Sequence, residues 1–253
     1  MNNVVINADD FGLNSSVNRA IVELFERGLV QSTTLMANMP GFDEAVEMAH
    51  QEHLTGKIGI HLVLTEGTPL TEDMRSANFL FHGKADFKQT LKNNLFFLDR
   101  RKQELIFNEL AAQIEKIRSC GIPISHIDTH HHVHEWYSVT KIIFDLMKKY
   151  SITSVRILNN MEQDKPLSKK LYRGGVNYVL RRRGLNFSEL FGSYDDYRAV
   201  LKGRPGSLAN KKVEVMVHPD YDSEGRLVDK VESSRANLFT EQMVELNNSD
   251  SQK

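Results

Sequence analysis

Short apolar runs alternate with amphipathic helical patterns along most of this chain, and no other feature restricts the fold as much. The first run, VVINA (4–8), predicts a buried strand. The stretch 14–30 follows, opens with capping residues and places Val17 and Ile21 on one helical stripe. Strands that alternate with helices predict parallel βαβ units, and strands that are apolar on both faces predict a sheet covered on both sides. We therefore expect a (β/α) barrel, complete or incomplete, or an open doubly wound sheet.

The same patterns predict where each element lies. Strands are predicted at 4–8, 32–38, 57–64, 124–128, 154–158 and 212–218, and helices at 14–30, 42–52, 86–119 (with one or two breaks) and 138–150. Residues 66–85 and 160–210 are poorly patterned, so we expect loops and insertions over one face of the sheet. No linker rich in Pro, Gly or Ser divides the chain, so residues 1–253 are expected to form a single domain with a polar tail from about residue 240.

Composition and charge argue against several classes of protein. The chain of 253 residues has 32 Lys and Arg against 33 Asp and Glu, a formal net charge of −1, so no nucleic-acid partner is predicted. The single cysteine, Cys120, allows neither an intrachain disulfide nor a cysteine-based metal site. The N-terminus does not resemble a leader, and no apolar run approaches the roughly 20 residues of a membrane span. We expect a soluble cytoplasmic protein without a membrane partner; barrels of this size often pair, so a homodimer is one expectation.

Polar side chains occur where the predicted strands end. The residues at these ends are Asp9-Asp10, His61, Thr129-His130, Arg156 and His218. Each has an ordinary alternative: an aspartate could cap the next helix, a histidine could be a hydrogen-bonded core or turn residue, and Arg156 could be half of a structural ion pair. Together these alternatives would require several costly buried polar groups at the same end of their strands. We therefore predict a functional site at the carboxyl ends of a parallel sheet.

The string HIDTHHHVH (126–134) contains five histidines and one aspartate in nine positions. Fully extended, it would span roughly 27 Å at about 3.3 Å per residue, and one ion with bonds near 2 Å cannot collect ligands over that length. One or two of these histidines can therefore bind a given ion. The others would orient ligands, contact substrate or pack, because a ligating imidazole usually donates its second N–H to a neighbour.

A site with three protein ligands is the simplest combination of these residues. One carboxylate from Asp9-Asp10, His61 and one histidine from 130–134 would leave coordination positions open for water and substrate. Such an open site is typical of a hydrolytic metal centre. The second aspartate would remain beside the cation, ionised and able to take a proton from water.

Four motifs together resemble a known family. NADDFG (7–12), GIHL (59–62), HIDTHHHVH (126–134) and HPDY (218–221) resemble the YdjC-like carbohydrate deacetylases, the chitooligosaccharide deacetylase family, in the same order along nearly the whole chain. The resemblance implies a TIM-barrel-like (β/α) barrel, incomplete or distorted. It also implies hydrolysis of N-acetyl groups on chitin-type oligosaccharides, with release of acetate.

The resemblance also implies roles for individual residues. Asp10, His61 and His130 would bind the metal, Asp9 would act as the catalytic base, and His218 would protonate the departing amine as general acid. One divalent ion is implied, with Mg²⁺ the usual assignment, whereas two imidazoles and a carboxylate favour Zn²⁺. The chain departs from the family pattern at Asp220, where a glycine is usual, at Thr129 in place of serine, and at Leu158 in place of proline.

Candidate substrate contacts lie beside the motifs. His132, Arg156, Trp136 and Phe11 are the residues predicted to contact the sugar, since flat rings can stack on a pyranose face. Each ring could instead pack in the wall of the fold, and this alternative is stronger for Phe11 than for Trp136. Two other functions stay open: a barrel phosphoesterase or amidohydrolase, which commonly assembles two metals, and a non-catalytic sugar- or metal-binding relative.

Overall fold

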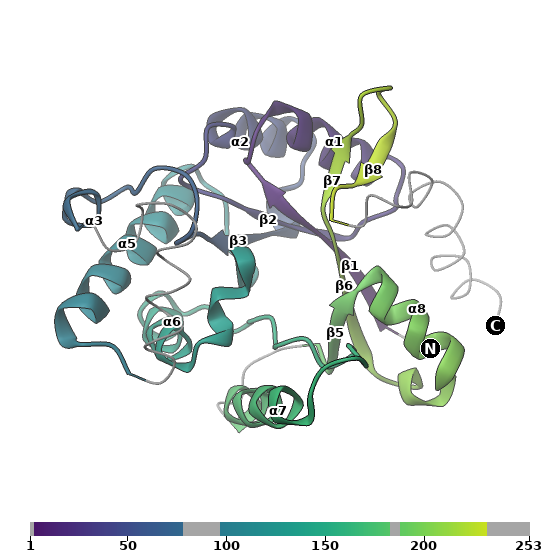
Figure 1. Ribbon diagram of the computed structural model, residues 1–253. Coiled ribbons are helices and arrows are strands. Elements are labelled where there is room, and N and C mark those ends of the chain that lie inside the picture. The colour runs from purple at the N-terminus through teal and green to yellow at the C-terminus, as the bar shows by residue number, and fades with distance from the viewer. Residues whose placement is uncertain (1–2, 78–96, 183–187, 232–253) are drawn as a thin grey trace.

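The computed structural model describes residues 3–77, 97–182 and 188–231, which fold around one curled parallel sheet (Figure 1). Within this part of the chain, six strands pair in parallel in the order β4-β3-β2-β1-β6-β5. The strands are β1 Asn3–Phe11, β2 Ser32–Leu35, β3 Ile58–Leu62, β4 Ile127–Thr129, β5 Leu190–Ser193 and β6 Lys212–Val217. β1 pairs with β2 on one side and with β6 on the other, which places the N-terminal strand in the middle of the sheet.

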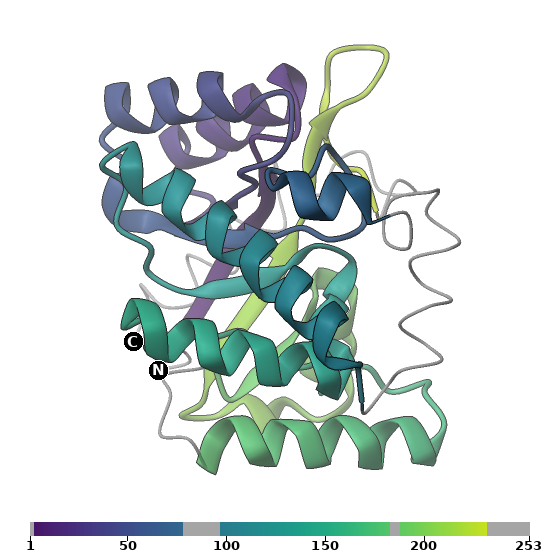
Figure 2. The same ribbon diagram turned by 90° about the vertical axis from the view of Figure 1, so that its left-hand side faces the viewer.

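Helices surround the outside of the curled sheet, as Figures 1 and 2 show. They are α1 Ser15–Glu26, α2 Phe42–Gln51, α3 Glu72–Ser76, α5 Arg100–Ser119, α6 Tyr137–Tyr150, α7 Leu167–Arg182 and α8 Tyr194–Gly203, with 3-10 segments η1 Thr55–Lys57, η2 His130–Glu135 and η3 Pro205–Leu208. The antiparallel hairpin of β7 (Pro219–Tyr221) and β8 (Leu227–Asp229) stands beside α1. None of the helices in the described ranges is long and apolar enough to cross a membrane.

The segment 154–160 spans the gap between the two edge strands, β4 and β5. The backbone N–H of Ile127 donates to Ser154 at 3.0 Å, and that of Arg156 donates back to Ile127 at 2.9 Å. Further along, the N–H of Asn160 donates to the carbonyl of Phe191 in β5 at 3.2 Å. The sheet is therefore an incomplete barrel of the TIM type, which confirms the expected fold. A full strand at 154–158 is not formed; a single bridge at Val155 takes its place.

Alternate positions on the strands separate an apolar outer layer from a polar interior. Ile58, Ile60 and Leu62 of β3 are all fully buried in the hydrophobic core between sheet and helices. The intervening positions carry Gly59, which lies against the ring of His126, and His61, which contacts Asp128 of β4. A strand's side chains point alternately to its two faces, so one sequence of residues serves both layers. Burying each large aliphatic side chain stabilises the fold by about 1.5–3 kcal/mol.

α1 illustrates how local sequence fixes an element that supports the site. The side chain of Asn14 accepts a hydrogen bond from the backbone N–H of Val17 at 3.0 Å and so caps the helix N-terminus. Val17, Ile21 and Leu24 form the buried stripe, as predicted. The helix therefore begins just beyond the end of β1 and packs its apolar face on the sheet.

Besides the strand at 154–158, two sequence expectations about the fold are wrong or only partly right. The region 160–210 contains α7, β5 and α8 in place of the expected loops. The sequence pattern did not indicate α7 for two reasons. The helix contains two adjacent glycines, which have low helix propensity, and Leu167 and Leu171 are exposed, so its apolar residues do not form one buried stripe. The region 66–85 contains the short helix α3, and of the helix expected over 86–119 the part 86–96 lies outside the described residues.

Candidate metal centre

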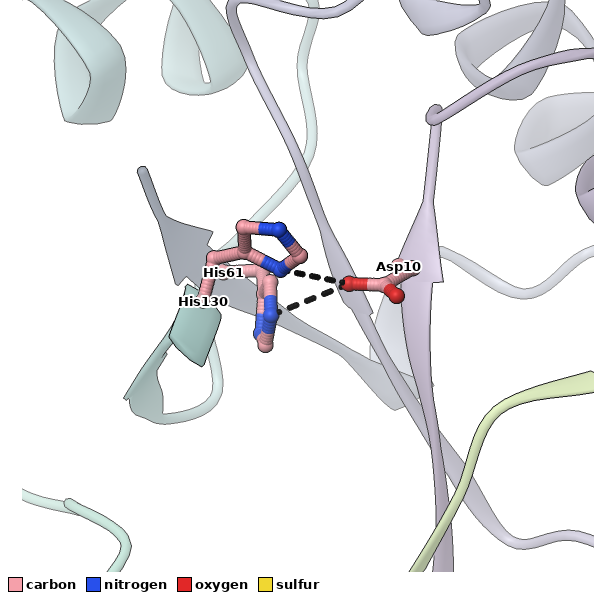
Figure 3. A group of neighbouring side chains, drawn as sticks. All are labelled: Asp10, His61 and His130. Carbon is pink, nitrogen blue, oxygen red and sulfur yellow. Dashed lines mark hydrogen bonds and ion pairs between the residues drawn. The ribbon is translucent and has the colours of Figure 1, made fainter. Parts of the chain in front are cut away.

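Side chains from three strand ends meet at the carboxyl edge of the sheet (Figure 3). His61 lies in β3, Asp10 in β1, and His130 begins η2 directly after β4. The Nε2 of His61 and the Nδ1 of His130 each lie 3.1 Å from the same oxygen, Oδ1 of Asp10. The candidate ligand atoms of the three residues all lie within 4.8 Å of one another. Two imidazoles and one carboxylate fit a divalent transition metal and leave positions open for water and substrate.

A β-bulge brings both adjacent aspartates to this site. In a regular strand Asp9 and Asp10 would point to opposite faces. The register of β1 against β2 shifts between Ala8 and Phe11, and Asp10 has a φ of 73°. Aspartate tolerates this left-handed conformation better than most residues, and bulges re-aim side chains beside active sites. Asp10 can therefore reach the histidines while Asp9 stays in the barrel interior.

His61 is held by a second carboxylate behind it. Its Nδ1 lies 2.6 Å from Oδ1 of Asp128, a residue that is 0 % exposed, and Thr34 donates to the other oxygen of Asp128 at 3.0 Å. Burial alone would lower the pKa of His61, but the carboxylates of Asp128 and Asp10 raise it to about 10. Surroundings that attract a proton this strongly also attract a metal ion to Nε2. The carboxylate at Nδ1 then fixes which nitrogen is free to bind.

The histidine string leaves β4 through a kink in η2. His131 and His132 have φ values of 53° and 51°, in the left-handed region that costs most residues roughly 1–2 kcal/mol each. The kink directs Nδ1 of His130 toward Asp10, and its Nε2 lies 2.8 Å from Oε2 of Glu66. His130 is thus the member of the string that lies in the cluster with Asp10 and His61.

Arg156 lies in the barrel interior and is 1 % exposed. Its Nη1 and Nη2 donate to the two oxygens of Asp9 at 2.6 and 2.7 Å, and its Nε donates to Glu214 at 2.6 Å. Nη1 also lies 2.8 Å from Oδ2 of Asp128. Burial alone would raise the pKa of Asp9, but this guanidinium lowers it well below its usual range. Arg156 was expected to contact the substrate, but its side chain is buried and its guanidinium is paired with carboxylates. It therefore forms a structural ion pair, which was the alternative interpretation.

Negative charge exceeds positive charge in this interior. The carboxylates of Asp9, Asp10, Asp128 and Glu214 are 1, 9, 0 and 7 % exposed, and Arg156 is the buried cation that contacts three of them. Buried charges are costly unless they are paired or coordinate a metal. The donor set of the cluster and this excess of carboxylates both fit a bound divalent cation.

His218, the predicted general acid, lies next to Asp9, the predicted base. It follows β6, its side chain is 20 % exposed, and its Nε2 is 4.0 Å from Oδ2 of Asp9. Its backbone N–H donates to Asp229 of the hairpin at 3.1 Å. Asp220, where the resemblance implies a glycine, accepts from Ser16 at 2.5 Å and so ties the hairpin to α1.

His132 and His134 occupy a different environment from His130. Among the described residues, neither Nδ1 of His132 nor Nε2 of His134 has a hydrogen-bond partner, and both atoms are buried. Burial, followed by the charge of Arg156, lowers the pKa of His132 to about 3. Burial, followed by the neighbouring His132, lowers the pKa of His134 to about 3. Both rings are neutral near pH 7, and the rings of His132 and Phe191 form a T-shaped pair with their centroids 5.9 Å apart.

The two predicted aromatic contacts differ in burial. Phe11 is 0 % exposed within the hydrophobic core, so its expected stacking on a sugar does not agree with the structure. Trp136 is partly buried, packs against the core and precedes α6. Trp136 therefore remains a candidate contact.

Several residues of the site were not predicted from the sequence. Asp128 lies inside the histidine string, two residues before His130. Residues with this spacing point to the same face of a strand, so Asp128 could have been predicted to lie in the site. Glu214 interrupts the apolar run of β6 and could have been found in the same way. Glu66 lies in a region without pattern, so no local signal points to it.

Comparisons with known proteins agree with the four motifs. A family model described as YdjC-like protein matches residues 3–250. The carbohydrate deacetylase of Vibrio parahaemolyticus is 37 % identical over 223 residues, which cover 86 % of this chain and 78 % of that protein. The carbohydrate deacetylase of Clostridium beijerinckii is 32 % identical over 223 residues, 86 % of this chain and 81 % of the relative. A further one, from Brevibacillus brevis, is 40 % identical over 149 residues, and this match spans 57 % of that relative's length.

One solved structure shares the fold over nearly its whole length. It is a crystal structure from Enterococcus faecalis V583, described as a cellobiose-phosphate cleavage protein, with a TM-score of 0.70 and 24 % sequence identity. The superposition covers 98 % of this chain and 94 % of that chain. At this identity the likeness concerns the fold alone.

Proposed function

This chain belongs to the YdjC-like protein family, and from that premise we propose that it is a metal-dependent carbohydrate deacetylase that hydrolyses N-acetyl groups of chitobiose-like oligosaccharides and releases acetate. The class of enzyme, a carbohydrate deacetylase, rests on the similarity to relatives of that name. The metal, the acetamide and the N-acetylglucosamine unit are the finer parts of the proposal. The observation that carries them is the cluster of Asp10, His61 and His130 beside a buried, ionised Asp9.

Asp10, His61 and His130 would hold one divalent ion. Such an ion, when bound, polarises a carbonyl oxygen and lowers the pKa of water. The two imidazoles favour Zn²⁺, and the family resemblance favours Mg²⁺. Three protein ligands leave room for substrate, in contrast to a structural zinc site with four.

Asp9 would take the proton of the attacking water. Asn7 donates to its Oδ1 at 2.8 Å and Arg156 to both oxygens, so the carboxylate is fixed in place and ionised. The same contacts make Asp9 a weak base, which suits a water whose own pKa is lowered. His218 would donate a proton to the amine nitrogen as the C–N bond breaks, which leaves acetate and a free amino sugar.

His132 and Trp136 would contribute to the substrate-binding wall. The side chain of His132 is half-buried, and its ring, which is neutral near pH 7, would contact the sugar. Trp136 follows the histidine string and offers the edge or face of an indole ring. These two contacts would affect substrate affinity more than the chemical step.

Acetate release from diacetylchitobiose, with and without chelator, tests the proposal. We expect chelation to abolish release and the replaced ion to restore it. Asp9→Asn should lower kcat by about 10²–10⁴-fold and keep the ion, because it removes a general base outside the ligand cluster. Asp43→Asn, at an exposed position of α2, is the matched control. Full activity after chelation, or unchanged kcat in Asp9→Asn, would contradict the metal or the base assignment respectively.

A further inference from the structure

We infer that Glu66 is a positioning residue for the metal centre: its carboxylate accepts the N–H of His130 Nε2 and so commits Nδ1 of His130 to the metal. The inference rests on the metal-dependent function proposed above. Nε2 of His130 lies 2.8 Å from Oε2 of Glu66, and Nδ1 lies 3.1 Å from Oδ1 of Asp10. Each nitrogen of the ring therefore faces a different carboxylate.

A neutral imidazole has one N–H and one lone pair, so the two nitrogens of His130 cannot play the same role. A metal needs the lone pair, and the remaining nitrogen must then carry the proton. Glu66 offers a charged acceptor at hydrogen-bond distance from Nε2, whereas the cluster with His61 and Asp10 lies at Nδ1. Such outer carboxylates fix the tautomer and raise the basicity of a ligating histidine.

His61 shows the same arrangement through opposite nitrogens. Its Nδ1 faces Asp128 at 2.6 Å, and its Nε2 faces Asp10 at 3.1 Å. Each histidine of the cluster thus has one carboxylate on the metal side and one behind it. The two outer carboxylates differ in exposure, because the side chain of Asp128 is 0 % exposed and that of Glu66 is 21 % exposed. Glu66 is therefore the outer partner at the open side of the site.

The loop that carries Glu66 is anchored at both ends by buried polar side chains of α5. Gln113 accepts from the N–H of Val63 at 2.9 Å and donates to its carbonyl at 2.8 Å. Glu109, which is 0 % exposed, accepts from the N–H groups of Leu70 and Thr71 at 3.0 and 2.9 Å. A loop tied in this way can present one side chain in a defined direction.

The residues next to Glu66 are also fixed. Asn38 donates to the carbonyl of Glu66 at 2.9 Å. Gly67 has a φ of 73°, and a Cβ there would lie 2.7 Å from the carbonyl oxygen of Asn38, so only glycine fits this close turn. Thr65 contacts Nδ1 of His131 at 2.8 Å, which joins the loop to η2. These contacts fix the loop at Glu66 next to His130.

A second metal ion at Glu66 is the competing interpretation. Candidate ligand atoms of Glu66, His130 and His131 also lie within 4.8 Å of one another. For two ions to share His130, both of its ring nitrogens would have to give up their protons. A bridging imidazolate of this kind is not needed when the Glu66 carboxylate accepts one N–H. We therefore expect one ion per chain.

Metal binding by Glu66→Ala and Glu66→Gln tests the inference. Zn²⁺ affinity would be measured by calorimetry, and the visible spectrum of bound Co²⁺ would report the ligand geometry. We expect Glu66→Ala to weaken Zn²⁺ binding by about 10–100-fold and to shift the Co²⁺ spectrum. Glu66→Gln should lose less, because its amide oxygen still accepts the N–H but without a charge. Glu72→Gln, at a position 76 % exposed on α3, is the control for the lost charge and should bind as the wild type does.

Three outcomes would separate failure of the inference from failure of the proposed function. Wild-type affinity and an unchanged spectrum in both Glu66 variants would overturn the inference alone. Two ions in the wild type and one in Glu66→Ala would make Glu66 a ligand and overturn it as well. No ion in the wild type, or unchanged binding in Asp10→Ala, would overturn the metal centre and the inference with it. Equal thermal unfolding of the metal-free proteins excludes a general loss of structure, and the near-isosteric Glu66→Gln covers the case in which Glu66→Ala does not fold.

Discussion

His130 and His134 lie four residues apart on η2, yet their imidazoles have opposite surroundings. The two nitrogens of His130 face the carboxylates of Asp10 and Glu66 at 3.1 and 2.8 Å. His134 is 4 % exposed, its Nδ1 lies 2.5 Å from the hydroxyl of Thr129, and its Nε2 has no partner among the described residues. The first ring lies between two carboxylates, whereas burial and the neighbouring His132 disfavour a positive charge on the second.

The difference shows that carboxylate neighbours decide which histidines of a dense string can bind a metal. Burial is common to both rings, so burial does not separate them. Arg156 contributes to the contrast, because its charge is among the causes that lower the pKa of His134. The same guanidinium forms ion pairs with Asp9, Asp128 and Glu214. Substitutions of these residues test whether the neighbouring charges cause the difference between the two rings.

The largest effect is expected from His130→Ala compared with His134→Ala. His130→Ala should remove a metal ligand and lower acetate release by about 10⁴-fold or more, since carbonyl polarisation and water activation are both lost. His134→Ala should keep the ion, because its ring lies outside the ligand cluster. Metal content by elemental analysis and kcat for both variants check this. Equal metal loss in the two variants would mean that the string binds as a unit.

That the three clustered residues lie close together could be predicted from sequence, because the positions of strand ends depend on general rules of parallel sheets. Parallel strands end at the same edge of a sheet, so His61 and His130 were expected to meet. The β-bulge at Asp10 could not be read from the sequence, since regular alternation would place Asp9 and Asp10 on opposite faces. Glu66 comes from a loop whose position depends on contacts with α5 that are distant in sequence.

The kink in η2 explains why the alternation of side chains along a strand predicts only part of the arrangement of these histidines. Parity places His130, His132 and His134 on one face, but the chain leaves the strand after Thr129 and turns through two left-handed residues. Tertiary contacts, which a single sequence does not contain, support that costly conformation. Tertiary contacts also explain why α7 was not predicted. Gly174 and Gly175 have low helix propensity, so this helix depends on packing for its stability.

A smaller effect, on stability, is expected from Arg156→Met. This change leaves Asp9, Asp128 and Glu214 buried without their shared cation, and breaking a buried pair in this way costs about 3–5 kcal/mol. Urea unfolding at pH 7 measures the loss. Arg100→Met is the control, because the pair of Arg100 with Glu104 is exposed and such pairs contribute about 0–1 kcal/mol. A loss below about 1 kcal/mol for Arg156→Met would mean that the interior carboxylates are not ionised together.

The smallest effect is the pH dependence that His134 adds to folding. Its pKa is about 3 in the folded chain against 6.5 for the free side chain, so between these values the unfolded state binds a proton that the folded state does not. The free energy of unfolding must therefore fall as the pH falls below 6.5, by at most about 1.4 kcal/mol per pH unit. Between pH 7 and 5.5 we expect the metal-free wild type to lose about 1 kcal/mol more than His134→Asn.

Urea unfolding at the two pH values gives this difference directly. His53→Asn, at an exposed position with a φ of 55° that asparagine tolerates, should keep the wild-type pH dependence. His132 and the buried carboxylates are common to all three proteins, so their own titration cancels in the comparison. If His134→Asn loses as much stability as the wild type on acidification, the ring of His134 is already able to take a proton in the folded chain. The contrast with His130 would then come from geometry alone and not from the charge of the surroundings.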